Sequence, residues 1–262
     1  MNELDNLPKV EIKADLTNVT EKIYTNTLEK PLKSTSNITT TVLDFFYNTI
    51  MYPMQKYNLY AQNKLENYAE DLQNRAKKIP EKNLVHPRVN ILGPAMEGLK
   101  YNLDEKYIKE MFTNILLSDM DNRRQSKVLP AYIEVVKQLS EEDAIFLKKL
   151  FLTKSNSFPL VELRGINPET NTFKKQFECI SLKNNSIELL KLPSLIVDNL
   201  ERLKIVSLTY GSRLIFKYDD LISAAKKTIN ESTIPPDTIL DGEKGIFEFT
   251  SFGKDFIDIC LS

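Results

Sequence analysis

Apolar residues recur at helical spacing along much of the chain, and the tightest pattern lies between Leu103 and Leu139. One face of this stretch carries large apolar side chains spaced for an α-helix, at Tyr107, Ile108, Met111, Phe112, Ile115 and Leu116. Asp104 stands where an N-cap is expected, so we predict a core helix from Asp104 to about Met120. A polar connector, Asp121–Ser126, then leads to a further helix at about Leu129–Leu139.

Upstream, the pattern predicts one long helix that Pro53 kinks or divides. Its apolar positions advance in steps of three and four from Met54 to Ile79, which keeps one stripe in register. Pro80 is expected to end this helix, and Pro94 to open a short one that runs to about Tyr101. Residues 1–36 are polar and weakly periodic, so we interpret them as a flexible arm.

Ser140 has the signature of a helix start, because acidic Asp143 follows three positions later. We expect that helix to carry four side chains inward: Ile145, Phe146, Leu150 and Phe151. From Thr153 to Ser186 the pattern weakens. Within it, Phe158–Leu163 and Phe173–Leu182 are consistent with short strands or with irregular structure.

The last third of the chain predicts a helix at Leu189–Leu203, then strands at Lys204–Thr209 and Leu214–Lys217 that pair as a hairpin. A short helix, a strand at Gly245–Phe249 and a closing helix capped by Thr250 complete this part. The order resembles that of a winged-helix domain.

The predicted fold class is therefore mainly α with a small β component. It combines an α-helical N-terminal domain, built on the long helix, with a winged-helix-like α+β C-terminal domain. We divide the chain into the arm at 1–36, the α-helical domain at 37–130 and the winged-helix-like domain at 131–262.

Composition and charge exclude several classes of protein. The 262 residues include 35 basic and 36 acidic side chains, so the net charge of -1 gives no overall attraction to nucleic acid or anionic lipid. Cys179 and Cys260 form neither a CxxC pair nor a disulfide framework, which fits a reducing compartment. We see no secretory signal and no apolar run long enough to span a membrane, and we expect a cytoplasmic protein.

The most distinctive polar group is Asp119, Asp121, Arg123 and Arg124, at the end of the predicted core helix. Two carboxylates two residues apart could hold a hard cation, with the arginines contacting phosphate. Alternatively, the group is an exposed helix end whose acids are balanced by the arginines that follow, and we favour this interpretation.

No other motif predicts catalysis, a cofactor or a metal ion. His86 is the only histidine and lies in a connector beside a proline, as a loop or packing residue does. The stretch Gly93–Lys100, GPAMEGLK, lacks the lysine spacing and hydroxyl of a phosphate-binding loop. We therefore expect no enzyme, no cofactor and no metal site.

In the winged-helix interpretation, Ser194–Leu203 is the third helix, which often enters the DNA major groove. Here it carries Asp198 and Glu201 against a single Arg202, and its exposed face would repel phosphates. Arg213 and Lys217 give the wing a little positive charge. We therefore favour protein contact over DNA binding for this domain.

Three segments carry a family resemblance: KKIPEKNLVHP, then ILGPAMEGLKYNLDEKYIKEMFTNILLSDMD, then VLPAYIEVVKQLSEEDAIFL. With them, the block from about Asn37 to Leu150 resembles the abortive-infection alpha (Abi-alpha) family of bacterial proteins, described as a domain of unknown function. These motifs consist of packing and capping residues, so no catalytic residue can be transferred.

The resemblance implies phage defence, by limiting growth of the infected cell. We expect a non-enzymatic sensor or effector that contacts a phage or host protein, with self-association left open. Two alternatives remain: a winged-helix DNA-binding regulator, with nucleic acid as the less favoured partner, and a metal-dependent nuclease or hydrolase using Asp119 and Asp121. The candidate interaction residues are Asp119, Asp121, Arg123, Arg124, Arg213 and Lys217.

Overall fold

The computed structural model describes residues 59–183, 186–229, 234 and 238–262. The predicted arm and the first part of the long helix, including Pro53, lie outside these residues. The chain divides into two compact units, residues 1–86 and 87–262.

In the first unit, α4 spans Leu59–Ala76 and a short 3-10 helix, η2, spans Glu81–Asn83. Tyr68, Leu72 and Ala76 are buried, four residues apart along α4. This part of the predicted apolar stripe is confirmed, and the helix ends before Pro80 as expected.

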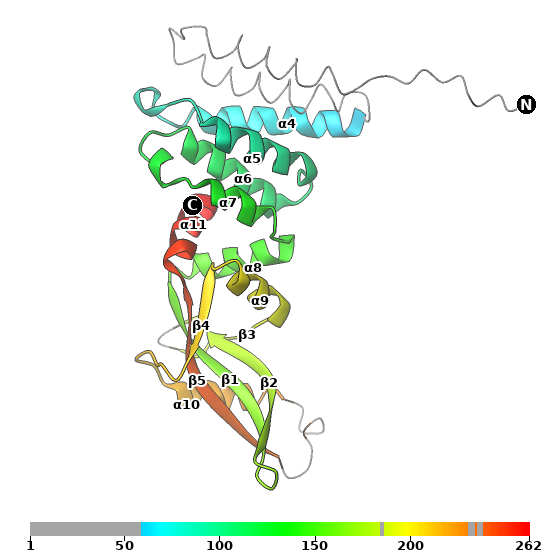
Figure 1. The fold of residues 1–262 in the computed structure, drawn as a ribbon, viewed down its shortest axis with the longest axis vertical. Helices are drawn as coiled ribbons and strands as arrows, with labels where there is room; N and C mark the ends of the chain where they lie inside the picture. The colour runs from blue at the N-terminus through cyan, green and yellow to red at the C-terminus, as the bar shows by residue number, and fades with distance from the viewer. Residues whose placement is uncertain (1–58, 184–185, 230–233, 235–237) are drawn as a thin grey trace, which may run out of the picture. The chain divides into compact units, whose positions relative to one another are not determined.

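The helices of the second unit gather around α6, Lys106–Asp119 (Figure 1). It contacts α5 (Val89–Tyr101), α7 (Pro130–Val136), α8 (Glu141–Leu152) and α11 (Ser251–Leu261). Four of its apolar side chains are fully buried, Met111, Phe112, Ile115 and Leu116. The predicted core helix is therefore confirmed as the centre of the helical packing.

The helix starts agree with the sequence in part. At α8, Ser140 Oγ accepts from the Asp143 amide at 3.1 Å and Asp143 Oδ2 accepts from the Ser140 amide at 2.8 Å, the predicted capping box. The prediction for α6 was wrong, because its N-cap is Glu105 and the Glu141 carboxylate accepts from the Tyr107 amide at 3.0 and 3.1 Å. Helix α5 begins five residues before Pro94.

All five strands form one antiparallel sheet in the order β3-β2-β1-β5-β4 (Figure 1). The strands are β1 (Ser157–Asn167), β2 (Thr172–Ser181), β3 (Leu189–Lys191), β4 (Val206–Tyr210) and β5 (Ile239–Phe249). Helix α10, Tyr218–Lys226, packs on one face over Val161, Leu163 and Cys179. Helix α9, Ser194–Arg202, lies between β3 and β4 in sequence and contacts β4 and α8.

This sheet overturns the predicted fold class. The described residues form an α+β fold with eight α-helices and a five-stranded sheet, and not a mainly α protein with a small β component. The expected hairpin does not form either, because β4 pairs with β5 and Leu214–Lys217 is not a strand. The structure therefore gives no support to the winged-helix interpretation.

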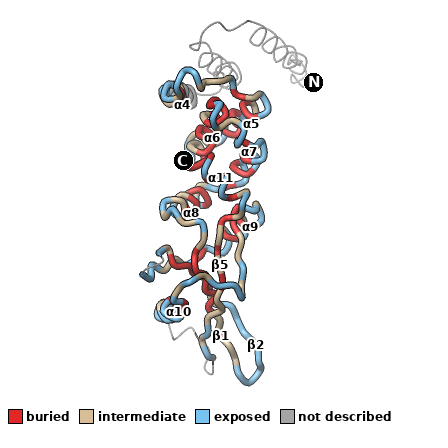
Figure 2. The backbone as a smooth tube through the Cα atoms, turned by 90° about the vertical axis from the view of Figure 1, so that its left-hand side faces the viewer, coloured by how far each residue is buried: buried red, intermediate tan, exposed pale blue. Residues whose placement is uncertain are grey.

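Charged residues within the strands explain the error. β2 contains Lys174 and Lys175, which left Phe173–Leu182 open between a strand and irregular structure. The first half of β5 contains Gly242 among charged residues, so only Gly245–Phe249 was predicted as a strand. The start of β2 and the turn before it, residues 171–175, are also exposed (Figure 2). Among the described residues, none of the helices combines the length and apolar character needed to cross a membrane.

Candidate interaction surface

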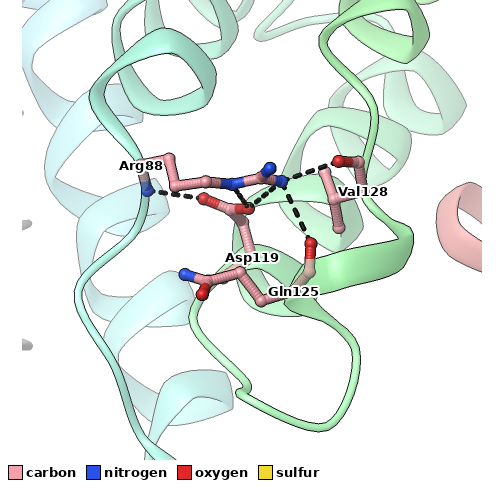
Figure 3. Close-up of polar contacts among 4 residues, drawn as sticks. All are labelled: Arg88, Asp119, Gln125 and Val128. Atoms are coloured by element: carbon pink, nitrogen blue, oxygen red, sulfur yellow. Dashed lines mark hydrogen bonds and ion pairs between the residues drawn. The ribbon is translucent and has the colours of Figure 1, made fainter.

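Asp119, at the C-terminal end of α6, is fully buried and bound by Arg88 (Figure 3). Its Oδ1 accepts from Arg88 Nε at 2.8 Å and from Nη2 at 2.6 Å, while Oδ2 accepts from the Arg88 backbone amide at 2.6 Å. Hydrogen bonds between charged partners of this kind are among the strongest in proteins. The carboxylate is therefore neutralised inside the fold.

Arg88 also fixes the connector that follows α6 (Figure 3). Its Nη2 donates to the carbonyl of Gln125 at 3.0 Å and to that of Val128 at 2.6 Å. The side chain of Gln125 in turn donates to the carbonyl of Asp119 at 2.8 Å. One guanidinium thus links the start of α5, the end of α6 and the residues before α7.

Asp121 is also buried, and its partner is the neighbouring Arg123. Arg123 Nε donates to Oδ1 at 2.8 Å and Nη2 donates to Oδ2 at 2.5 Å. The hydrogen bonds from Arg123 lower the pKa of Asp121 against the opposing effect of burial. Arg124 turns to α11 instead, where it donates to the Asp258 carbonyl at 2.6 Å and to Ser262 Oγ at 2.8 Å.

The four predicted polar residues therefore share a connector but act in separate contacts. Both acids are buried where we expected an exposed helix end, and Asp119 is balanced by Arg88, which precedes it by 31 residues. In the part of the chain that the structure describes, no three His, Cys, Asp or Glu side chains are grouped so that they could hold a metal ion.

Arg213 and Lys217 lie in the loop between β4 and α10, and both are exposed. They line one open pocket of about 350 Å³ together with Lys244 of β5 and Asp219 of α10. Tyr218 fixes this loop, because its hydroxyl accepts from the Leu214 amide at 3.1 Å and donates to the Gly245 carbonyl at 2.8 Å. The structure thus brings two of the predicted residues together, beside the sheet.

The cations of this pocket differ in their pairing. Lys244 Nζ lies 2.6 Å from Asp219 Oδ1, and this contact lowers the pKa of Asp219. The side chains of Arg213 and Lys217 make no hydrogen bond or ion pair with any residue that the structure describes. The charge of Arg213 also helps to lower the pKa of Asp219, but neither side chain is held in an ion pair with a described residue, so both remain open to a partner from solution.

A second open pocket of about 590 Å³ adjoins the first and shares Arg213 and Lys244 with it. Its wall includes Arg164 of β1, whose guanidinium carbon lies 4.3 Å from the centre of the Phe173 ring on β2. Phe173 is 59% exposed, as is Ile239, and both are aligned with Ile166 across three strands. This end of the sheet therefore presents apolar side chains next to Arg213.

A row of carboxylates crosses the same sheet at Glu178, Glu162 and Glu243, which are paired in register across β2, β1 and β5. Arg164 forms ion pairs with Glu162 and Glu243, and Lys175 Nζ lies 2.8 Å from Glu178 Oε1. Burial acts to lower the pKa of Arg164, but the hydrogen bond and charge of Glu162 and the charge of Glu243 raise it overall.

Glu178, at one end of this row, also accepts a hydrogen bond from the hydroxyl of Tyr210 on β4. Burial and that hydrogen bond together raise the pKa of Tyr210 well above its usual value. Gly245 leaves room for the ring, since a β-carbon there would lie 3.1 Å from Tyr210 Cδ1. This row was not predicted from the sequence. Its only local signal is the spacing of Glu162 and Arg164, which are two positions apart and therefore share one face of a strand.

The predicted residues therefore fall into two separate places. The connector after α6 lies among the helices, whereas the loop before α10 lies beside the sheet (Figure 1). Only Arg213 and Lys217 remain as charged candidates that face solvent without a partner in the described structure.

No curated protein and no solved structure matches the chain. A family model does match, and its span of residues 60–260 covers both the helical packing and the sheet. The family resemblance is thereby confirmed, although the match begins at residue 60 and not at about Asn37, and it extends beyond Leu150 towards the C-terminus. The chain belongs to the abortive infection alpha family.

Proposed function

We propose that this protein acts in bacterial defence against phage by abortive infection, which limits the growth of the infected cell. Membership of the abortive infection alpha family supports this role, because the match spans most of the chain. In this proposal the protein works in the cytoplasm as a non-enzymatic sensor or effector that contacts a phage or host protein.

The proposed contact surface is the pocket that Arg213 and Lys217 line. Arg213 and Lys217 are exposed, line one pocket and have no side-chain partner in the described structure. Exposed apolar side chains, Phe173 and Ile239, lie at the adjoining end of the sheet. An exposed aromatic side chain and an arginine beside other exposed apolar groups are a typical composition for a protein-binding patch.

The connector supports a non-enzymatic mode of action. A metal-dependent hydrolase that used Asp119 would need its carboxylate, but three hydrogen bonds from Arg88 occupy both oxygens. Asp121 is held in the same way by Arg123. In this proposal both acids stabilise the fold and do not take part in chemistry.

The defence role is tested by plating a broad phage panel on otherwise identical strains with and without the gene. We expect at least one phage to plate less efficiently when the gene is present. The test also follows survival of the infected cells, because abortive infection protects the population and not the infected cell. Equal plating of every phage on both strains would remove the proposal.

A further inference from the structure

A groove with a volume of about 690 Å³ lies between α8 and α9. Its walls include Ser140 and Glu142 from the start of α8, and Leu195, Ile196, Asp198 and Arg202 from α9. Hydrogen bonds within the groove hold the two helices in place, because Asn199 Nδ2 donates to Asp143 Oδ2 at 2.9 Å. The groove is thus formed before any partner arrives.

The apolar side chains of the groove are not needed for the core. Helix α9 buries Val197 and Leu200, while Leu195, on another side of the helix, is 84% exposed. Ile196, the other apolar side chain of the lining, is only partly buried. Ile145 of α8, which we expected inside, is 47% exposed but does not line the groove. Large apolar side chains that remain exposed beside a groove are typical of a surface that a partner covers.

The charges of the groove specify the partner further. Glu142 and Asp198 line the groove, and neither forms an ion pair or side-chain hydrogen bond with any described residue. The lining holds one cation, Arg202, which donates to the neutral amide oxygens Gln138 Oε1 at 3.0 Å and Asn199 Oδ1 at 2.8 Å and so keeps its charge. With Asp143, the lining has three carboxylates against this one guanidinium, so the groove offers apolar contact in a net acidic setting.

We propose that the groove between α8 and α9 binds an amphipathic helical segment of a partner protein, with an apolar face and flanking Lys or Arg residues. Amphipathic helices commonly place their apolar face in such grooves, and charges at the rim select the partner. The same acidic rim would disfavour nucleic acid. The proposal does not depend on the phage-defence role or on the surface around Arg213.

A direct binding experiment on the full-length protein tests it. The chain contains no tryptophan, so a single Trp in a synthetic peptide supplies the only indole emission. The probe is a Leu/Lys peptide of about five helical turns with one Trp on its apolar face, and its counterpart replaces every Lys with Glu. We expect a blue shift and saturable binding for the basic peptide, with at least tenfold weaker binding of the acidic one.

Three variants, each checked for folding by circular dichroism, distinguish the groove from general stickiness. Leu195→Asp should weaken binding of the basic peptide about tenfold or more, equivalent to about 1.4 kcal/mol. Asp198→Lys should weaken the basic peptide and strengthen the acidic one. Ile215→Asp is the matched control, because Ile215 is fully exposed and lies outside the groove, and it should bind as the wild type does.

Four results would contradict binding in the groove. Equal binding of basic and acidic peptides to the wild type, no saturable binding of the basic peptide, or full binding by Leu195→Asp would overturn the proposal. Equal losses in Leu195→Asp and Ile215→Asp would do the same, since they would indicate contact with exposed apolar side chains in general.

Discussion

Gly98 of α5 lies directly against the ring of Phe112 on α6, where a β-carbon at position 98 would come within 2.4 Å of Phe112 Cζ. The ring is fully buried, so it has little room to move. We expect Gly98→Ala to lower the free energy of unfolding by about 1–3 kcal/mol, because overpacking outweighs the gain in helix propensity. Urea denaturation measures this loss.

Gly93 provides the matched control on the same helix, because a β-carbon there would meet nothing within 4 Å. Gly93→Ala should therefore cost little or nothing, because the gain in helix propensity is opposed by the restriction that Pro94 places on the residue before it. Similar effects of the two alanine substitutions would contradict the close packing of α5 on α6.

Substitutions in the ion pair between Arg88 and Asp119 should be among those that destabilise the fold most. Arg88→Ala leaves a fully buried carboxylate without its charge partner, and we expect a loss of about 3–5 kcal/mol of unfolding free energy. Lys137→Ala, which removes an exposed ion pair with Glu134, should cost less than about 1 kcal/mol. A loss of similar size in both variants would argue against the anchoring role of Arg88.

The sequence indicated part of this arrangement. The residues at the end of α6 are distinctive in the sequence itself, because acids and arginines follow one another there after a strongly apolar helix. The partner of Asp119 could not be found in the same way, since Arg88 stands beside Pro87 in a segment without periodicity. Contacts between side chains 31 residues apart leave no local pattern.

Asp121 should make the stability depend on pH through Arg123. The pKa of Asp121 is lower in the folded protein than in the unfolded chain, so its ionised form favours folding. This contribution is fully present above the unfolded value of about 3.9 and is lost as the pH falls through the folded pKa.

Arg123→Gln should therefore be less stable than the wild type at about pH 7 and pH 5, and the difference should shrink at about pH 3. Chemical denaturation at each pH gives the two free energies of unfolding. A difference that stays constant or grows down to the lowest pH would show that Asp121 and Arg123 are not linked in this way.

Arg164 separates two acids that face each other across β1 and β5. Glu162 and Glu243 are register partners, and like charges in that position oppose pairing of the strands. Arg164→Met keeps much of the length of the side chain but removes the charge, and it should lower the free energy of unfolding by about 1–3 kcal/mol.

Adding Glu243→Gln to Arg164→Met should recover part of this loss, because one of the two facing charges is then gone. The double variant and both single variants form a double-mutant cycle that measures the coupling directly. Additive effects would indicate that the carboxylate row is not held together by Arg164.

The same row explains why the sheet was underestimated from sequence. Lys175, Glu178 and Glu243 are suited to a strand only because their charges are paired within the sheet. Local propensity counts such residues against β structure, and the compensation becomes visible only when the strands are paired. Cap motifs, by contrast, are local, and both Ser140 and Thr250 cap their helices as predicted.

We propose that this abortive infection alpha protein acts through contacts at Arg213 and Lys217 and not through chemistry at Asp121. Asp121→Asn removes the carboxylate that a metal-dependent mechanism would use. The double substitution Arg213→Glu and Lys217→Glu reverses the charges of two side chains that line the pocket. The matched control is Lys149→Glu with Lys254→Glu, two exposed lysines that line neither pocket beside the sheet.

The decisive measurement is the plating efficiency of a phage that the wild-type gene restricts, on strains that carry each variant at equal protein level. We predict that restriction persists with Asp121→Asn and with the control pair, and that it falls at least tenfold with Arg213→Glu and Lys217→Glu. Restriction that is abolished by Asp121→Asn in a folded protein, and retained when Arg213 and Lys217 are reversed, would contradict the account.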